Sequence, residues 1–385
     1  LMNSANMSVR TFMEEPKLIA NPMDRIADIV GKMRETNYWS VPVVQDGKLV
    51  GVVDYKTLMA KRFGPDTKVL TVMVPTPKLE STADEARVIA AFFNTRARAI
   101  PVVDEKSRLV GIVTREAVLK HYLDRGEIPS RPVREFMNSP VLTVNAQDSV
   151  ARARYLMRSY NVSRLPVMDK ESLAGIVTMR DLALRLLFSY KGRKRASIMT
   201  EEEKLMAMPV SEIMTYPVIT AKGSDPLEEA VSRMLSRKVS GLPVLEGDRV
   251  AGMISGIDVI VKVLARKFEL SSPISAKLAK GITGDQRALM DGLLERYMAK
   301  FERMVEVIDF KVGVKEEASS EGKPLYKVNL RLVTKIGDFV ATESDYDPVT
   351  ATRKAAEDLE ERLLRKLKKI EEMKKTRGDV AKRGE

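Results

Sequence analysis

The sequence predicts an α+β protein in which four β-α-β-β-α repeats precede a β-α-β-β-β-α domain. Three observations carry this prediction. An apolar strand containing Pro, a polar turn and a strand led by Gly occur four times, with the glycines at Gly51, Gly111, Gly175 and Gly252. Each occurrence follows an opening segment of the form Val-x-x-x-Met, at residues 9–13, 69–73, 133–137 and 210–214. After residue 307 the apolar period changes to two, which is typical of a half-buried sheet.

The elements within a repeat follow from its hydrophobic periods. In the third repeat, Val150, Ala153, Leu156 and Met157 fall on one face of a helix. Polar turns such as Asp46-Gly47 join the two short strands and predict a β-hairpin, after which a second helix begins. A unit of this size exposes an apolar face, so we expect neighbouring copies to pair.

Composition excludes several classes of protein. The 385 residues include no Cys and one His, which excludes disulfides, thiolate nucleophiles, iron–sulfur clusters and His-rich or Cys-rich metal centres. No basic, apolar leader and no uncharged apolar run of about 18 residues is present, so we expect a cytoplasmic protein that does not enter a membrane. The formal net charge of +12 favours an acidic partner such as nucleic acid, or simply a Lys-rich soluble protein. The Lys/Glu-rich, Cys-free composition is compatible with a thermophilic archaeon.

The fourfold repeat resembles the CBS domain. The four copies span residues 7–66, 67–127, 128–190 and 205–268. The resemblance implies that copies one and two form one Bateman module, that copies three and four form a second, and that adenine nucleotides or related adenosyl ligands bind between the copies of a module. It also implies association into a homodimer. The basic run at residues 191–195, before copy four, is interpreted as a solvated loop or a nucleic-acid contact.

The ligand signature of this family is a Ser or Thr at the end of the Gly-led strand and an Asp three residues later. Copies three and four carry it as Thr178 with Asp181 and Ser255 with Asp258. The resemblance implies that the carboxylate accepts the ribose hydroxyls and that the hydroxyl and helix N-terminus receive a phosphate. The same spacing is also a capping box, so a purely structural role stays open. Copies one and two depart from the signature, with Asp54 before Thr57 and Thr114 before Ala117.

The resemblance assigns further residues to the ligand, which would be AMP, ADP, ATP or another adenosyl compound. The apolar-Pro strands would line an adenine slot through Leu165, Pro166, Leu242 and Pro243. Arg164 and Arg180 are candidates for phosphate contacts, with solvated arginines as the alternative. The sequence shows no catalytic constellation and no metal-ligand set: His121 lies alone on a helix, and no phosphate-loop motif is present. We therefore expect no enzymatic activity.

The C-terminal residues predict a different domain, spanning residues 274–375. A first strand near 274–278 precedes a helix at about 286–304, two alternating strands at 308–315 and 326–332, and a short strand around 339–342. Asp347 and Pro348 form an N-cap with Pro at the first helical position, which begins a long helix to about residue 375.

The stretch from Tyr326-Lys-Val-Asn-Leu-Arg-Leu through Asp347-Pro-Val-Thr-Ala-Thr-Arg resembles the ribosome hibernation factor family (HPF/RaiA). This resemblance implies binding to the small ribosomal subunit, its rRNA and proteins, in the channel for mRNA and tRNA. Residues 286–385 hold 22 Lys+Arg against 20 Asp+Glu, so bulk charge does not argue for RNA, but the placement of the cations does. The candidates on the open sheet face are Lys311, Lys315, Lys327, Arg331 and Lys335, and those on the final helix are Arg362, Arg365, Lys366, Lys368 and Lys369.

Together these patterns predict a non-enzymatic ribosome hibernation factor that binds the decoding channel, inhibits translation and senses adenine nucleotides, with a dimer able to hold two small subunits. Two alternatives remain open: a CBS regulatory subunit that controls a partner enzyme, and a DNA-binding regulator. The lack of a helix-turn-helix signature disfavours the DNA-binding alternative.

Overall fold

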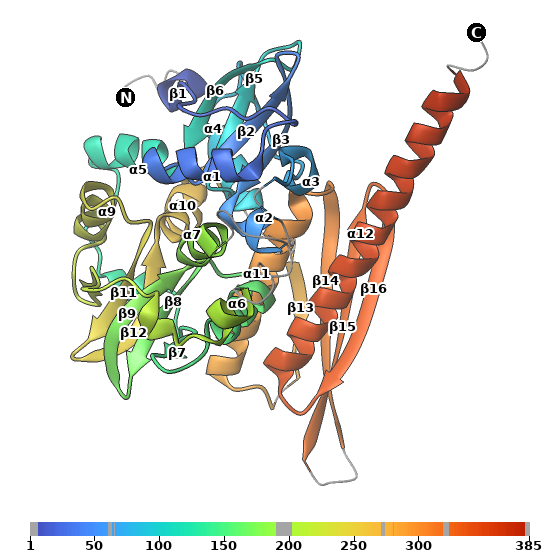
Figure 1. The fold of residues 1–385 in the computed structure, drawn as a ribbon. Coiled ribbons are helices and arrows are strands. Elements are labelled where there is room, and N and C mark those ends of the chain that lie inside the picture. Colours follow the sequence, from blue (N-terminus) through green and yellow to red (C-terminus); the bar gives the residue numbers. More distant parts are fainter. Residues whose placement is uncertain are drawn as a thin grey trace. The chain divides into compact units, whose positions relative to one another are not determined.

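The chain forms two compact units, residues 1–271 and 272–385, in the computed structural model (Figure 1). The structure describes residues 7–60, 64, 66–189, 202–270, 274–279, 281–318 and 323–381. The basic run at 191–195, interpreted above as a loop or nucleic-acid contact, lies outside these residues.

The first unit contains the four β-α-β-β-α repeats that the sequence predicts. Repeat one contains a bridge at Ala20, then α1 (Ile26–Glu35), β2 (Ser40–Gln45), β3 (Lys48–Asp54) and α2 (Tyr55–Ala60). Repeat two contains β4 (Leu79–Glu80), α4 (Glu85–Thr95), β5 (Ala99–Val103), β6 (Leu109–Thr114) and α5 (Arg115–Asp124). Repeat three contains β7 (Val144–Asn145), α6 (Val150–Ser159), β8 (Arg164–Asp169), β9 (Ser172–Thr178) and α7 (Met179–Ser189). Repeat four contains β10 (Ala221–Lys222), α9 (Leu227–Ser236), β11 (Gly241–Glu246), β12 (Arg249–Ser255) and α10 (Gly256–Lys262), followed by η4 (Leu264–Phe268).

The opening segments do not pack on the copies that they precede. They form η1 (Val9–Thr11) with β1 (Met13–Glu14), α3 (Val69–Val72), η2 (Val133–Glu135) and η3 (Val210–Glu212). The first lies on copy two, where β1 pairs with β6, and the second lies on copy one, where Val74 pairs with Val52. Copies three and four exchange their opening segments in the same way, through Asn138 with Met253 and Thr215 with Ile176. This exchange ties the copies into two pairs, the two Bateman modules.

The Gly that leads each second strand makes room for the exchanged segment. A Cβ at Gly252 would lie 2.7 Å from the carbonyl oxygen of Asn138, and one at Gly51 would lie 2.8 Å from that of Val74. Because backbone atoms cannot rotate away, only glycine fits at Gly51 and Gly252, where the strand pairs with the exchanged segment.

The hydrophobic cores run across the modules. One core joins copy one to copy three, with Ile29 and Leu58 packed together with Leu165 and Leu182. A second core joins copy two to copy four, with Phe92 and Tyr122 among its buried side chains. Exchange of opening segments therefore links copies within a module, whereas apolar packing links the two modules to each other.

The second unit has the predicted β-α-β-β-β-α order. It contains β13 (Ile274–Lys277), α11 (Gly284–Glu302), β14 (Val307–Ala318), β15 (Pro324–Thr334), β16 (Gly337–Asp345) and α12 (Pro348–Ala381). The sheet order is β13-β14-β15-β16, with β13 parallel to β14 and the other neighbours antiparallel. The last strand has nine residues, longer than the short strand expected, because it pairs with β15 along its whole length. Inward-facing Phe310, Leu330 and Leu332 are fully buried, as are Tyr297 and Leu359 of the two helices.

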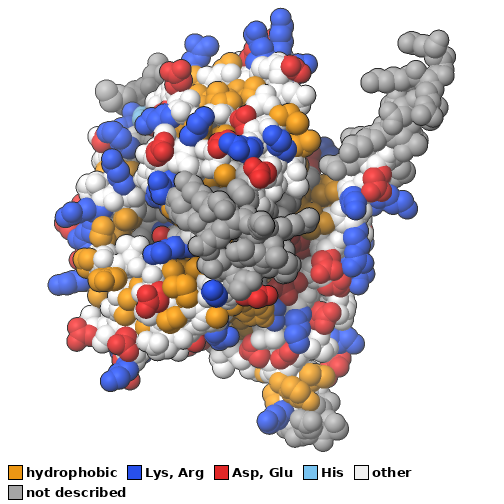
Figure 2. Space-filling view, in the orientation of Figure 1, with side chains coloured by type: hydrophobic (Ala, Val, Ile, Leu, Met, Phe, Trp, Pro, Cys, Tyr) orange, Lys and Arg blue, Asp and Glu red, His pale blue; other side chains and the backbone are white. Residues whose placement is uncertain are grey.

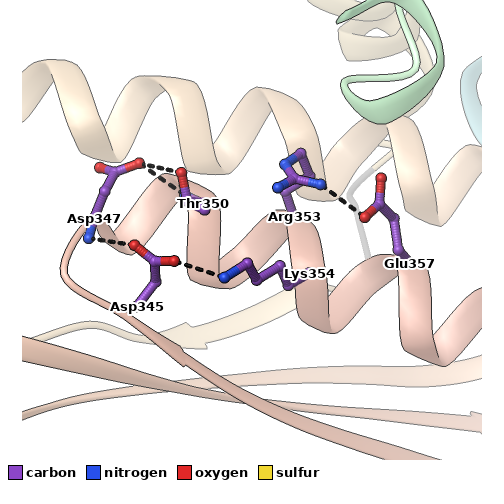
Figure 3. Close-up of polar contacts among 6 residues, drawn as sticks. All are labelled: Asp345, Asp347, Thr350, Arg353, Lys354 and Glu357. Atoms are coloured by element: carbon purple, nitrogen blue, oxygen red, sulfur yellow. Dashed lines mark hydrogen bonds and ion pairs between the residues drawn. The ribbon is translucent and has the colours of Figure 1, made fainter. Parts of the chain in front are cut away.

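The start of α12 confirms the predicted cap. The Asp347 carboxylate accepts hydrogen bonds from the Thr350 backbone N–H at 2.9 Å and from its hydroxyl at 2.7 Å (Figure 3). Lys354 Nζ bonds to Asp345 at 2.8 Å, and so joins the first turns of the helix to the end of β16. Figure 1 shows α12 continuing beyond the strands, and Leu363 is its last fully buried side chain among those described.

Candidate ligand sites and candidate RNA interface

Asp258, the predicted ribose carboxylate of copy four, lies at the N-terminus of α10 and is 3% exposed. Its Oδ2 accepts the Ser255 backbone N–H at 2.9 Å and also the Ser255 hydroxyl, so the capping box is formed. Its Oδ1 accepts a hydrogen bond at 2.7 Å from the side-chain amide of Asn138, on the exchanged opening segment. Both carboxylate oxygens of this site therefore have protein partners.

Asn138 is itself held in place by Lys262. The Lys262 ammonium donates to Asn138 Oδ1 at 2.8 Å and to the backbone carbonyls of Phe136 and Met137 at 2.8 and 3.0 Å. These bonds orient the amide so that its NH₂ group points to Asp258. The chain Lys262–Asn138–Asp258 was not predicted from the sequence, because Asn138 lies 120 residues before its carboxylate partner.

Asp181, the corresponding carboxylate of copy three, has a different environment. Its Oδ2 accepts the Thr178 backbone N–H at 2.8 Å and the Thr178 hydroxyl at 2.7 Å. Within the described part of the chain, no hydrogen bond reaches Oδ1. Burial raises the pKa of Asp181, while the Thr178 bonds and the nearby charge of Arg180 oppose that rise. Among the described residues, Oδ1 of this carboxylate is thus the oxygen without a hydrogen-bond partner.

Copies one and two have helix caps of other kinds at these positions. Asp54 caps α2 by accepting the Thr57 backbone N–H at 2.7 Å. Here the Asp precedes the hydroxyl residue, which is the reverse of the order in copies three and four. In copy two, Thr114 accepts the backbone N–H of Ala117 at 3.0 Å and no carboxylate stands there. Neither copy places a carboxylate at the third helical position. This confirms the departure from the signature that the sequence predicted for both copies.

The strand residues expected to line an adenine slot are buried. Leu165 and Leu242 are fully buried in the two cores, and Pro166 and Pro243 are buried beside them. Their side chains are therefore core residues, and only their backbone groups could contact a base.

Arg164 and Arg180 lie in contacts between copies rather than as solvated cations. Arg164 of copy three donates a hydrogen bond to Ser240 Oγ of copy four. Burial lowers the pKa of Arg164 to about 10, and the like charge of Arg98 adds to this effect, so the group stays charged near neutrality. Arg180, also of copy three, donates to the side-chain oxygen of Asn37 in copy one.

Trp39 of copy one lies among these arginines. Its ring centroid is 4.2 Å from the guanidinium carbon of Arg98 and 5.7 Å from that of Arg180, both within cation–π range. Tyr55 packs edge-on against the indole at 5.4 Å. Burial raises the pKa of the Tyr55 hydroxyl, and the nearby charge of Arg180 opposes that rise. Sequence reasoning missed Trp39 and Arg98, although both stand three residues before the Pro of their strand.

In the second unit, the face of the sheet opposite the helices carries four of the five cations predicted for it. The fifth, Lys335, lies in the turn between β15 and β16, because β15 ends at Thr334. Cross-strand pairing aligns Lys311 with Arg331, and Lys315 with Lys327. The row between them is formed by small or uncharged residues, Gly313, Asn329 and Thr342. The alternation predicted from the sequence is confirmed, since all four cations are exposed.

Most of the predicted cations are paired with carboxylates. On the sheet the pairs are Lys311–Asp309 at 3.2 Å, Lys327–Glu317 at 3.9 Å and Arg331–Asp338 at 2.7 Å. Beyond the strands, Lys335 pairs with Glu306 at 2.7 Å. On α12 they are Arg362–Asp358 at 2.9 Å and Arg365–Glu361 at 3.0 Å. Within the described residues, Lys315, Lys366, Lys368 and Lys369 form no ion pair. On the face of the molecule seen in Figure 2, Lys and Arg side chains are interspersed with Asp and Glu side chains.

Comparison with known families agrees with this architecture. The CBS domain model matches residues 9–64, 70–124, 133–187 and 210–265, together more than half of the chain. The chain belongs to the CBS domain family, with four such domains. Residues 283–383 match the C-terminal domain of the hibernation factor Hib. Neither description names an enzyme. Among the described residues, no helix is long and apolar enough to cross a membrane, and no cluster of His, Asp and Glu could hold a metal ion.

Three relatives that match more than half of the chain come from archaea. Uncharacterized protein MJ1404 of Methanocaldococcus jannaschii is 24% identical over 337 residues, which is 86% of this chain and 79% of that protein. An uncharacterized 33.4 kDa protein in a ribosomal RNA operon of Thermofilum pendens is 26% identical over 271 residues, 64% of this chain and 88% of its own length. The crystal structure of MJ1225 from M. jannaschii has a TM-score of 0.60 at 22% identity, and covers 66% of this chain and 99% of that one.

Proposed function

We propose that this protein is a ribosome hibernation factor whose C-terminal unit binds the small ribosomal subunit in the mRNA and tRNA channel and inhibits translation. The observation that carries the proposal is the match of residues 283–383 to the hibernation factor domain, with a helix-free sheet face on which Lys311, Lys315, Lys327 and Arg331 are all exposed. Such a face suits phosphate contacts that do not depend on base sequence. One relative is also named for its place in a ribosomal RNA operon.

The four CBS domains would act as the sensor of an adenosyl ligand such as AMP, ADP or ATP. In copies three and four the carboxylates Asp181 and Asp258 would receive the ribose hydroxyls, and backbone groups of β8 and β11 would contact the base. Arg164 and Arg180, joined by Arg98, would supply positive charge for the phosphates. A ligand changes ribosome binding only by its differential affinity for two arrangements of the chain, typically about 1–3 kcal/mol.

A second candidate function is that of a regulatory subunit that controls a partner enzyme, with the C-terminal unit as a protein-docking domain. The ion pairing favours this candidate. Carboxylates offset Lys311, Lys327, Arg331 and Lys335, and a face of alternating charge is also suited to a protein partner.

Co-sedimentation of the full-length protein with purified small ribosomal subunits tests the proposal. We expect binding that weakens as salt is raised from about 50 to 200 mM, because phosphate contacts release counterions. The triple variant Lys315→Glu, Lys327→Glu, Arg331→Glu should abolish it. A matched control is Lys78→Glu, Lys106→Glu, Arg249→Glu, which makes the same charge change at three exposed cations of the CBS unit.

The two candidates give different results in this experiment. Loss of binding in the sheet variant but not in the control supports the hibernation factor. Binding that is weak, insensitive to salt and equal in both variants contradicts it and favours the regulatory subunit.

The same sedimentation measures assembly. A homodimer that joins two small subunits should give a larger particle that contains one small subunit per protein chain. Single small subunits at saturation would exclude that form. Ribosome binding would also place the protein in the cytoplasm.

A further inference from the structure

We propose that Asn138 acts as a gate on the copy-four site, so that copies three and four bind their ligands with unequal affinity. The inference rests on the nucleotide-sensing role proposed above. In this structure the Asn138 amide occupies the carboxylate oxygen of Asp258 that a ribose hydroxyl would otherwise reach, at 2.7 Å. A ligand at copy four therefore has to displace Asn138, whereas a ligand at copy three meets an oxygen of Asp181 to which no described residue donates a hydrogen bond.

The gate is held closed by a charge-assisted network. Asp258 is 3% exposed and uses both oxygens, one for the cap with Ser255 and one for Asn138. The Lys262 ammonium donates a hydrogen bond to Oδ1 of Asn138 at 2.8 Å, at the opposite end of the amide from the NH₂ group that reaches Asp258. Hydrogen bonds to charged groups are stronger than neutral ones, and breaking one without replacement is costly inside a protein.

The same position in copy three shows what the gate requires. Thr215 pairs with Ile176 through two backbone hydrogen bonds of 3.1 and 2.8 Å, just as Asn138 pairs with Met253 at 3.0 and 2.8 Å. The backbones are therefore equivalent, but the Thr215 side chain is exposed and makes no hydrogen bond to Asp181 in the described residues. Four residues after each Asp, copy three also has an exposed Arg185 where copy four has Lys262.

The gate can open because Asn138 is exposed as a whole residue. It also lies on the segment that leaves copy two and pairs with copy four. Release of its amide would free Lys262 from one of its three acceptors on this segment, the other two being the carbonyls of Phe136 and Met137. Occupancy of copy four would thus change the chain at the junction between the modules, and occupancy of copy three would not.

Isothermal titration calorimetry of the full-length protein with AMP tests the gate. Asp181→Ala isolates the copy-four site and Asp258→Ala isolates the copy-three site. We expect the wild type to show one tighter and one weaker site. Asn138→Thr, which installs the residue of copy three, should raise the affinity of the weaker site roughly tenfold, as expected when a competing charge-assisted bond is removed. In the Asp258→Ala background the same substitution should change nothing.

Hydrogen exchange gives a second measurement on the same proteins. AMP concentrations that fill both sites should increase amide exchange in residues 133–140, and concentrations that fill only the tighter site should not. Should Asn138→Thr fail to fold, Lys262→Met tests the gate instead, since it removes the donor that orients the amide.

The outcomes separate the inference from the function on which it rests. Two equal sites that Asn138→Thr leaves unchanged would overturn the gate while preserving nucleotide sensing. Absence of any binding of AMP, ADP, ATP and 5′-methylthioadenosine by the wild type would overturn nucleotide sensing itself. A tenfold gain that also appears in the Asp258→Ala background would show an effect unrelated to the carboxylate, and would contradict the proposal.

Discussion

Glu302, the last residue of α11, is a partly buried carboxylate with a perturbed titration. Burial raises the pKa of Glu302 to about 7, the like charge of Glu306 adds to the rise, and the Val307 backbone N–H opposes it. The folded state thus holds this proton more tightly than the unfolded state does. The stabilisation of the folded state by this bound proton is complete below about pH 4.5 and is lost as pH rises through about 7.

We expect Glu302→Gln to remove this pH dependence. At pH 8 the variant should be more stable than the wild type by about 1–2 kcal/mol, a value reduced for the partial exposure of the carboxylate. Urea unfolding followed by circular dichroism at pH 5 and pH 8 measures the difference. Glu316→Gln, at an exposed position of β14, is the control and should behave as the wild type. Equal gains in both variants would contradict the role of burial.

Sequence reasoning located the candidate carboxylates but could not rank them. Asp181 and Asp258 stand in the same motif, and both cap a helix as the spacing predicted. What separates them is Asn138, which is distant in the sequence and close in the fold. Trp39 and Arg98 were missed for a similar reason, because their contact joins copies one and two and no local pattern reports it.

At the scale of elements, the exchanged opening segments determine which substitutions the Gly-led strands tolerate. We expect Gly252→Ala to lower the free energy of unfolding by about 1–3 kcal/mol, because the new Cβ meets the carbonyl oxygen of Asn138, whose strand is fixed by hydrogen bonds. Gly175→Ala should cost less, since the two atoms nearest to its Cβ are the Sδ and Cγ of Met214, which can move by side-chain rotation. Thermal melts of both variants measure the order, and a larger loss for Gly175→Ala would contradict this reasoning.

The cap of α12 is a second element whose contribution is measurable. Asp347→Ala removes the acceptor of two Thr350 hydrogen bonds and should lower the stability of the second unit by about 1 kcal/mol. Asp347→Ser should restore most of the loss, because a hydroxyl can also accept from the backbone at this position. The measurement is urea unfolding of both variants, and failure of Ser to improve on Ala would show that the carboxylate acts through charge alone.

For the whole molecule, the single Trp offers a way to observe one unit by itself. Trp39 lies in the CBS unit, and each unit has its own core. We expect Asp347→Ala to shift the circular dichroism transition, which reports both units, and to leave the midpoint of Trp fluorescence unchanged. Equal shifts by both probes would show that the two units unfold together.

The order of elements was predictable across the whole chain, and the partners of those elements were not. Hydrophobic periods show which side chains are buried, but they do not show that copy one packs on copy three or that opening segments are exchanged. Net charge was also an incomplete guide. Alternation along the strands predicted a basic face, whereas carboxylates such as Asp309 and Asp338 lie beside the same lysines and arginines.

The exchange of opening segments bears on how such a chain can evolve. Val9 and Phe12 are buried in the core that contains copy two and not copy one, and Val69 and Val72 are buried in the core that contains copy one and not copy two. A gene duplication that added one repeat would supply a segment with no sheet to receive it and a sheet with no segment to cover it. Duplication of a pair of repeats would leave every segment with a sheet and every sheet with a segment, so this design favours growth by two repeats at a time.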